Sequence, residues 1–430
     1  MGKLALAVSQ LDALFAAWRD VRAQVRKSSW PQITAELAAM EAAPLRVLRD
    51  IRSRLRQGRY EFSPKLGYVK RKSGGSRRGI TVHGISDRIV QRSILNVVHT
   101  RDSSLITHLG AIPMMLDTPT TFAGTPGRGV PEAVAATVRA IREGACALAT
   151  SDMKDFFPRV PRGEVVEFLK ANIADDEFTR LFEAALETEI KNRDEIAQWL
   201  ELFPLSEVGV AQGSLLGVLV GNLSLRHFDV RLNAGSLTTI RYLDDFIILG
   251  PDLEAVSAGF EEAKDELAKL GMACYQPGDG SQKSFLGLTA NGFDFLGCRI
   301  HLDGVTPARA ARRKLLREVA EAIREGKSQI RDFQKNANHR RSEATYAQTL
   351  SYIDRKIRGW GDAYRFVSNR LAFAQLDAQI DRLIDGFRGW FSRQYRGADP
   401  RTRRRITGVA LLGDTPPKSP KGGRARPNAP

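Results

Sequence analysis

The stretch that most constrains this chain is R-Y-L-D-D-F-I-I-L, residues 241–249, in which two adjacent aspartates are flanked by apolar and β-branched residues. The pattern predicts two short strands joined by a turn at Asp244 and Asp245. Side chains alternate between the two faces of an extended chain, so only a tight turn lets both carboxylates approach one point. Like charges repel, and burying them is costly without a partner. The segment therefore predicts a sheet edge whose charge something must neutralise.

A second acidic segment, T-S-D-M-K-D-F-F-P at residues 150–158, has the same character. Asp152 ends a short apolar run, and Asp155 follows three residues later. Either segment alone fits an ordinary turn or a helix N-cap, where aspartate is common. If the two strands are neighbours in one sheet, three carboxylates converge at one edge. Oxygen ligands without His or Cys suit Mg²⁺ or Mn²⁺, with Asp244 as the firm ligand and Asp245 as the looser one.

The charge balance indicates what the site acts on. A formal net charge of +16 and a pI of about 10 predict a polyanionic partner, most simply nucleic acid. Basic residues crowd 70–78, 309–317 and 324–341 as well as the end of the chain. A two-metal carboxylate site in such a protein suggests phosphoryl transfer on nucleic acid, although a nuclease would use similar metals. The G-x-x-x-x-G-K-[ST] motif is absent, which argues against a P-loop NTPase.

Cysteine usage and hydropathy bound the setting. The three cysteines are scattered and form no C-x-x-C pair, which indicates a reducing compartment and no zinc site. No uninterrupted apolar run suits a membrane span, so no membrane partner is expected. Apolar positions near the N-terminus recur at helical spacing, which favours an amphipathic helix over a signal peptide.

Periodicity divides the chain into four expected regions. They are an N-terminal helical extension (1–62), a mixed body of hairpins, strands and helices (63–305), a basic helical region (306–397) and a disordered basic tail (398–430). Within the body we expect a hairpin over 67–82, a helix over 87–98, strands over 145–152 and 293–300, and a strand-turn-strand over 238–249. Helices are expected over 161–200 and about 252–270. We find no internal repeat.

Several motifs then follow one another in a known order. They are K-R-K-S-G-G-S-R-R-G-I (70–80), D-R-I-V-Q (87–91), F-A-G-T-P-G-R-G-V-P-E-A-V (122–134), S-D-M-K-D-F-F (151–157), A-Q-G-S-L-L-G (211–217), Y-L-D-D (242–245), Q-K-S (282–284), F-L-G-C (295–298) and I-R-G-W-G-D-A-Y-R (357–365). The ordered set resembles bacterial reverse transcriptases, of the group II intron-like and stand-alone defence-associated kinds. The resemblance covers roughly residues 60–395 and implies an α/β (α+β) right-hand polymerase with fingers, palm and helical thumb.

The resemblance implies roles position by position. Asp152, Asp244 and Asp245 match the catalytic, metal-binding carboxylates. Residues that match nucleotide-binding positions are Lys70, Arg78, Asp155, Phe157, Gln212, Gly213 and Lys283. Phe157 matches the steric gate that excludes a ribose 2′-hydroxyl, with an ordinary core Phe as its alternative, and Lys283 matches a general acid, with a surface Lys as its alternative. Residues expected to contact nucleic acid are Arg128, Arg312, Arg313, Lys314, Arg358 and Arg365.

The chain also departs from the family pattern. Ala123, Gly124 and Thr125 interrupt the segment usually read G-F-R-P-G-R. Gly217 and Val218 stand where the motif around Gln212 usually continues to Ser-Pro, which puts primer-template handling in doubt. No Cys/His cluster indicates an appended endonuclease finger.

The function implied is RNA-directed DNA polymerisation with two Mg²⁺ ions, or Mn²⁺, using dNTPs and a DNA primer. The template would be a non-coding or intron RNA, the setting the bacterial cytoplasm, and the role antiphage defence. Two alternatives remain open: a template-independent or protein-primed nucleotidyltransferase, and an RNA-binding maturase-type protein. The sequence predicts neither the template nor the oligomeric state.

Overall fold

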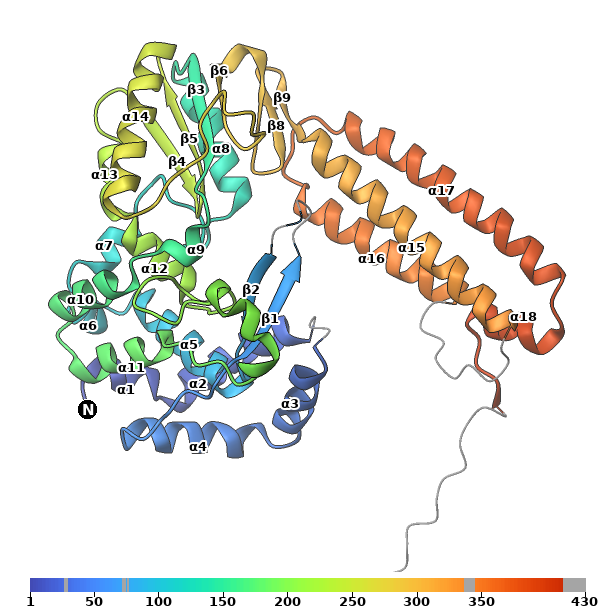
Figure 1. The fold of residues 1–430 in the computed structure, drawn as a ribbon, viewed down its shortest axis with the longest axis horizontal. Coiled ribbons are helices and arrows are strands. Elements are labelled where there is room, and N and C mark those ends of the chain that lie inside the picture. The colour runs from blue at the N-terminus through green and yellow to red at the C-terminus, as the bar shows by residue number, and fades with distance from the viewer. Residues whose placement is uncertain (27–29, 72–74, 76, 336–344, 413–430) are drawn as a thin grey trace, which may run out of the picture. The chain divides into compact units, whose positions relative to one another are not determined.

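The computed structural model describes residues 1–26, 30–71, 75, 77–335 and 345–412 of the chain (Figure 1). The fold divides into two compact units, Met1–Asn291 and Gly292–Pro430. Part of the predicted Gly-rich turn, at 72–74 and 76, and the tail from 413 onward lie outside the described residues.

Four helices open the first unit, as the apolar spacing predicts. They are α1 (Lys3–Val8), α2 (Leu11–Val25), α3 (Pro31–Ala42) and α4 (Pro44–Arg56). Their apolar faces, with Leu4, Leu14 and Leu48 fully buried, join one core with α5 (Ile85–Val98). Helix α1 is also held by Asp175, whose carboxylate accepts hydrogen bonds from the backbone N–H groups of Leu4 and Ala5.

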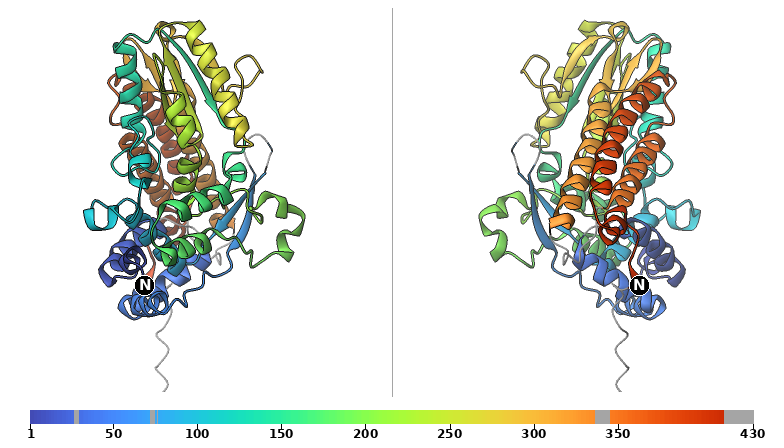
Figure 2. Two further views of the ribbon diagram at one scale, coloured as in Figure 1. Left: turned by 90° about the vertical axis from the view of Figure 1, so that its left-hand side faces the viewer. Right: turned by 90° about the vertical axis from the view of Figure 1, so that its right-hand side faces the viewer.

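The predicted hairpin forms, with β1 (Leu66–Arg71) paired antiparallel to β2 (Arg77–Val82). A four-stranded antiparallel sheet of order β4-β5-β3-β6 follows, made of β3 (Ala147–Asp152), β4 (Thr238–Tyr242), β5 (Asp245–Gly250) and β6 (Phe285–Leu288). Helix α14 (Leu253–Lys269) packs on β3 and β5, and α8 (Val130–Arg142) packs on β4 and β5. The two helices lie on opposite sides of the strands (Figure 2), which explains why β5 reads as an unbroken apolar run after its aspartate.

Shorter elements connect the strands. They are α6 (Ser103–Ile106), α7 (Ile112–Leu116), α9 (Phe156–Arg159), α10 (Arg162–Asn172), α11 (Asp176–Leu186), η1 (Asp194–Leu202), α12 (Gly217–Ser224), α13 (Arg226–Arg231) and η2 (Thr289–Asn291). The helical region expected over 161–200 is therefore divided into α10, α11 and the 3₁₀ helix η1, and the α-helical part ends at Leu186. Beyond it Ile190 pairs as a bridge with Lys65, and a small core of Ile190, Ile196 and Phe203 packs against β1. Tertiary contacts with the hairpin override local helical preference there.

The second unit opens with an antiparallel sheet of β7 (Phe293–Phe295), β8 (Cys298–His301) and β9 (Gly304–Pro307). The single strand expected over 293–300 is thus a hairpin. Leu296 and Gly297, with φ of 48° and 75°, reverse the chain between β7 and β8.

Three long helices form a bundle in the second unit: α15 (Arg309–Lys335), α16 (Tyr346–Ala363) and α17 (Leu371–Arg396). Their core includes Val319, Ile353 and Phe387. A further helix, α18 (Pro400–Thr407), lies where the sequence predicts a disordered tail. Asp399 caps this helix, and Ile406 is fully buried in the bundle core, a single apolar anchor that composition averages away. No helix in the described ranges is long and apolar enough to cross a membrane.

Candidate active site

The two acidic segments meet at one edge of the four-stranded sheet. Strands β3 and β5 are antiparallel neighbours, and their register places Asp152 directly opposite Asp245. Side chains opposite each other in an antiparallel pair lie on the same face, so these two carboxylates share a face. The backbone N–H of Met153 donates to the carbonyl of Asp244 (3.0 Å), which brings the third aspartate to the same edge.

The Y-L-D-D segment forms the tight turn that the sequence predicts. Tyr242 pairs with Asp245, so Leu243 and Asp244 are the two loop residues of a hairpin. Leu243 has φ of 62°, a left-handed conformation that costs a residue with a Cβ about 1–2 kcal/mol. This turn is what lets adjacent aspartates, which would point apart along a straight strand, lie at one edge.

Electrostatics at this edge are unfavourable for the three charges alone. Burial, followed by the negative charge of Asp152, raises the pKa of the Asp244 carboxyl. Burial and the charges of Asp244 and Asp152 raise the pKa of Asp245 to about 7, although its side chain keeps contact with solvent. Crowded carboxylates favour the protonated form unless a cation offsets them.

The donor set fits a hard divalent cation, because the available ligands are carboxylate oxygens. Within the described residues, however, no three His, Cys, Asp or Glu side chains are already arranged around one ion position. The Lys283 ammonium instead forms an ion pair with Asp152. Although burial alone would lower the pKa of Lys283, this ion pair raises it.

Lys283 therefore lies at the site, as its position in the sequence predicts. Its ammonium is 4.6 Å from the centre of the Tyr275 ring, and Ser151 donates a hydrogen bond to the Tyr275 carbonyl (2.7 Å). The backbone N–H of Tyr275 donates to the Asp152 carbonyl (3.1 Å). The segment that carries Tyr275 thus extends the sheet beside Asp152 and brings Lys283 to the carboxylates.

Asp155 and the two phenylalanines that follow it have different surroundings. Asp155 is exposed, with φ of 48°, at the start of α9. Phe156 is 2% exposed and belongs to the core, whereas Phe157 is only partly buried. A Cβ added at Gly217 would lie 3.3 Å from the Phe157 ring, so the absence of a side chain at Gly217 gives this ring its room.

The loop that carries Gln212 and Gly213 rests on β2. The Thr81 N–H donates to the Gln212 carbonyl (2.8 Å). Gly213 has φ of 125°, and a Cβ there would lie 2.1 Å from the Thr81 carbonyl oxygen. Only glycine fits both the backbone conformation and the close approach.

On the hairpin, Lys70 and Arg78 are register partners and both are exposed. Their side chains share one face, as two groups contacting the same phosphates would need. Arg71 and Arg77 form the next pair, and the Arg77 guanidinium stacks 3.9 Å from the Trp199 ring centre.

The residues expected to contact nucleic acid differ in whether they already form ion pairs or hydrogen bonds within the chain. Arg128 is engaged inside the chain, with Asp117 (2.6 Å) and the carbonyls of Thr118 and Thr121. The Arg358 Nε–H is shared between both carboxylate oxygens of Asp354 on its own helix (2.9 and 3.0 Å), in an ion pair. Arg313 and Arg365 are exposed, and Arg312 is partly buried with an Nε that has no partner. Lys314 lines a cavity of about 370 Å³ together with Arg355 and Trp360.

Comparison with known proteins decides the family. The family model "Reverse transcriptase (RNA-dependent DNA polymerase)" matches residues 69–300, more than half of the chain. The chain belongs to the reverse transcriptase family. The resemblance to reverse transcriptases and the mixed helix-and-sheet fold class predicted from the sequence are thereby confirmed. Members of this family generally use divalent metal ions.

Solved structures add more distant similarities. One is the "Partial Cas6-RT-Cas1--Cas2 complex", with 22% identity and a TM-score of 0.33 over 61% of this chain and 42% of that chain. Another is the apo telomerase from Candida Tropicalis, truncated from its C-terminal domain, with 13% identity and a TM-score of 0.38 over 57% and 55%. The chain spans about half the length of these solved chains. A comparison with curated proteins gives no match.

Sequence reasoning assigned no role to two residues that contact this family's motifs. Gln91 is fully buried; it accepts a hydrogen bond from the Leu215 N–H (3.3 Å) and donates to the Ala185 carbonyl (3.0 Å). Arg241 is also fully buried, directly before the Y-L-D-D turn. A charged residue inside an apolar strand is the signal that could have identified Arg241, because buried charges need partners.

Proposed function

We propose that this chain is an RNA-directed DNA polymerase that extends a DNA primer with dNTPs on an RNA template. The observation that carries the proposal is the placement of Asp152 opposite Asp245, with Asp244 on the adjoining turn. Family membership supports the assignment of these three carboxylates. Two Mg²⁺ ions, or Mn²⁺, held by them would activate the primer 3′-hydroxyl and stabilise the leaving pyrophosphate.

The other side chains have roles that fit their surroundings. Lys70 and Arg78, side by side and exposed on the hairpin, are proposed to bind the triphosphate. Lys283, already beside Asp152, is proposed to donate a proton to the departing pyrophosphate. Phe157, partly exposed against Gly217, is proposed to exclude the ribose 2′-hydroxyl, and the Gln212–Gly213 loop to support the nascent base pair.

The partners we propose are a non-coding or intron RNA as template, with the DNA product retained by the basic bundle. A net charge of +16 supports a polyanionic partner, and exposed cations such as Arg313, Lys314 and Arg365 offer phosphate contacts. The proposed setting is the bacterial cytoplasm, in antiphage defence. Both follow from the motif resemblance to stand-alone bacterial enzymes.

Primer extension on a defined RNA template tests the activity. Wild-type protein with Mg²⁺ should extend a DNA primer to the template's end, and the Asp244→Asn variant should not. Product of template-determined sequence supports the proposal. Homopolymeric or random product would instead favour a template-independent transferase, and absence of synthesis with retained RNA binding would favour a maturase-type protein. Sequencing nucleic acid that copurifies with the protein would identify the template.

A further inference from the structure

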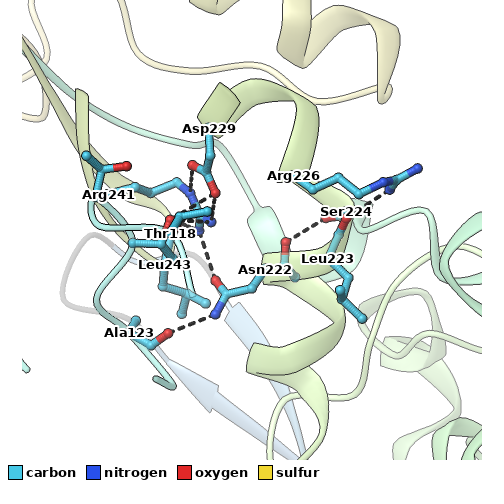
Figure 3. A network of polar contacts seen from close by, with 12 residues as sticks. Thr118, Ala123, Asn222, Leu223, Ser224, Arg226, Asp229, Arg241 and Leu243 are labelled. Carbon is cyan, nitrogen blue, oxygen red and sulfur yellow. Dashed lines mark hydrogen bonds and ion pairs between the residues drawn. The ribbon is translucent and has the colours of Figure 1, made fainter. Parts of the chain in front are cut away.

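The buried Arg241 side chain donates hydrogen bonds to four different residues, of which Asp229, Asn222 and Leu243 are labelled in Figure 3. Its Nε and Nη2 donate to the two carboxylate oxygens of Asp229, at 2.7 and 2.6 Å. Nη1 donates to the Asn222 Oδ1 and to the Leu243 carbonyl, both at 3.0 Å. Nη2 also donates to the Thr121 hydroxyl at 3.4 Å. Arg241 is 0% exposed and Asp229 6%, so the pair is removed from water.

Burying such a pair is a poor way to gain stability, because desolvating two charges offsets most of their attraction. An apolar pair of similar volume would serve the core as well. What the planar guanidinium adds is geometry: its donors point in fixed directions and tie several acceptors to one plane. Arg241 therefore fixes the geometry of the segments that carry its acceptors.

One of its acceptors is the Y-L-D-D turn itself. Leu243 holds a left-handed conformation that is unfavourable for its residue type, and the Arg241 Nη1 binds its carbonyl. The next carbonyl, of Asp244, accepts the Met153 N–H. Both loop residues of the turn are therefore anchored through their carbonyls, and with them the direction in which Asp244 presents its carboxylate.

Another acceptor, Asn222, lies on α12, the helix that follows the Gln212–Gly213 loop. Asn222, on α12, binds Arg241 through Oδ1 and donates through Nδ2 to the Ala123 carbonyl (2.8 Å). The segment that carries Ala123 also binds the backbone of Arg241: the Arg241 N–H donates to the Thr120 carbonyl, and the Phe122 N–H donates to the Arg241 carbonyl. Helix α12 begins only four residues after Gly213.

The two departures from the family pattern meet at this point. Gly124 has φ of 75°, and a Cβ there would lie 2.4 Å from Cγ1 of Val218. Val218 occupies space that any side chain at position 124 would need. The unusual residues in the two motifs thus fit one another, and together they seat the 120–124 segment on α12, where Asn222 reaches both it and Arg241.

We propose that Arg241 is a positioning residue for the reaction. With Asp229 and Asn222 it holds the Leu243–Asp244 turn so that Asp244 and Asp245 can bind divalent cations, and Asn222 makes this arrangement depend on α12. The inference rests on the proposed function, since it presupposes that the carboxylates bind cations. Residues that orient metal ligands typically change metal affinity by 10- to 100-fold when altered.

The test compares Asn222→Ala with a matched control, Thr239→Val. The first change leaves the Arg241–Asp229 pair intact and removes one anchor. The control removes a different buried hydrogen bond of strand β4, which the Thr239 hydroxyl donates to the Leu232 carbonyl (2.8 Å). This hydrogen bond does not involve the Leu243–Asp244 turn. Arg241→Lys, which keeps the charge but loses the fork, is a second variant. Readouts are Mn²⁺ binding to the protein alone by electron paramagnetic resonance, the Mg²⁺ concentration for half-maximal primer extension, and the Tm.

We expect Asn222→Ala to weaken Mn²⁺ binding, and to raise the half-maximal Mg²⁺ concentration, by about tenfold. At saturating Mg²⁺ its KM for dNTP should change by less than about twofold. Thr239→Val should keep wild-type Mn²⁺ affinity even if its Tm falls as far. Wild-type Mn²⁺ binding and Mg²⁺ dependence in Asn222→Ala, whatever its Tm, would overturn the inference and leave the proposed function standing. If Asp244→Asn binds Mn²⁺ as wild type does, the carboxylate assignment fails and the inference fails with it.

Discussion

The three aspartates lie together at one edge of the sheet, as their sequence context predicts. Their types and flanking residues predict a shared edge and a tight turn, and the structure places Asp152 opposite Asp245 with Leu243 and Asp244 in the turn. Their assignment as metal ligands stays a prediction. The sequence could not predict the electrostatic cost of placing these carboxylates together. The pKa of Asp245 depends on its burial and on neighbouring charges, including that of Asp152 on a different strand.

That cost leads to a first prediction. Asp245→Asn should lower dNTP incorporation by about 10²–10³-fold or more, because under the proposed function it removes a ligand of the cations that stabilise developing charge in the transition state. In the absence of divalent cations the same variant should have a higher Tm than wild type, since it relieves repulsion with Asp244 and Asp152. Differential scanning fluorimetry in EDTA and primer extension measure the two effects.

The matched control is Asp265→Asn, which removes an exposed carboxylate on α14. It should leave both the Tm and the incorporation rate near wild type. A lower Tm for Asp245→Asn in EDTA would contradict the electrostatic account of the site.

The adjacent phenylalanines allow a second prediction. Phe157→Ala should lower the preference for dNTP over rNTP, measured as the ratio of kcat/KM values, by about 10- to 100-fold. Phe156→Leu, in the core beside it, should cost about 0.5–3 kcal/mol of stability and leave the preference unchanged. An unaltered preference in Phe157→Ala would make Phe157 a packing residue only.

Among elements, those with a strong local pattern were predictable and those defined by distant contacts were not. The hairpin, the strand ending at Asp152 and the strand-turn-strand form close to the predicted positions. The end of α11 at Leu186 and the β7–β8 hairpin were missed, because the first depends on pairing with Lys65 and the second on two left-handed residues. Helix α18 was missed because one buried side chain, Ile406, holds a segment of strongly basic composition.

The contact between β2 and α5, beside the Gln212–Gly213 loop, supports a third prediction, about pH. His83 is 1% exposed; its Nδ1 faces the Gln91 amide nitrogen and its Nε2 faces the Thr81 hydroxyl, both at 3.3 Å. Burial, with the charges of Lys65 and Arg88, lowers the pKa of His83 to about 3. An amide N–H directed at Nδ1 requires the neutral ring, so protonation would break this contact.

The sign follows from proton uptake. In the unfolded chain His83 titrates near 6.5, so between about pH 6.5 and 3 the unfolded state binds one more proton than the folded state. The contribution of neutral His83 to the free energy of unfolding is therefore present above pH 6.5 and is lost as the pH falls. Between pH 7 and pH 5 the loss is about 2 kcal/mol.

Comparison with His83→Gln isolates this term from other titrating groups. The difference in opening free energy between wild type and variant should shrink by about 2 kcal/mol from pH 7 to pH 5, measured by hydrogen exchange of α5 amides. The exposed His227, changed to Gln, should keep the wild-type pH dependence. If the difference in opening free energy between wild type and His83→Gln stays constant with pH, His83 is not held neutral in the folded protein.

Over the whole molecule the dominant property is positive charge, and the structure changes how its contribution should be tested. Deleting everything after residue 400 would remove the buried Ile406 from the bundle core and cost about 2–5 kcal/mol, which confounds any loss of binding. Deletion of 413–430 leaves Ile406 in place and removes four cations, Lys418, Lys421, Arg424 and Arg426.

If these four cations contact RNA phosphates, the truncated protein should bind RNA more weakly. The slope of log K against log salt concentration should become shallower by up to about 3, since each lost contact with a single strand removes about 0.7. Filter binding or fluorescence anisotropy over about 50–300 mM salt measures both the RNA affinity and this slope. Replacing the same four residues by Gln in the full-length chain should reproduce the effect, because the argument concerns charge and not length. A slope equal to that of wild type in both variants would assign the electrostatic part of RNA binding to the folded units, where Arg313, Lys314 and Arg365 would be the next residues to replace.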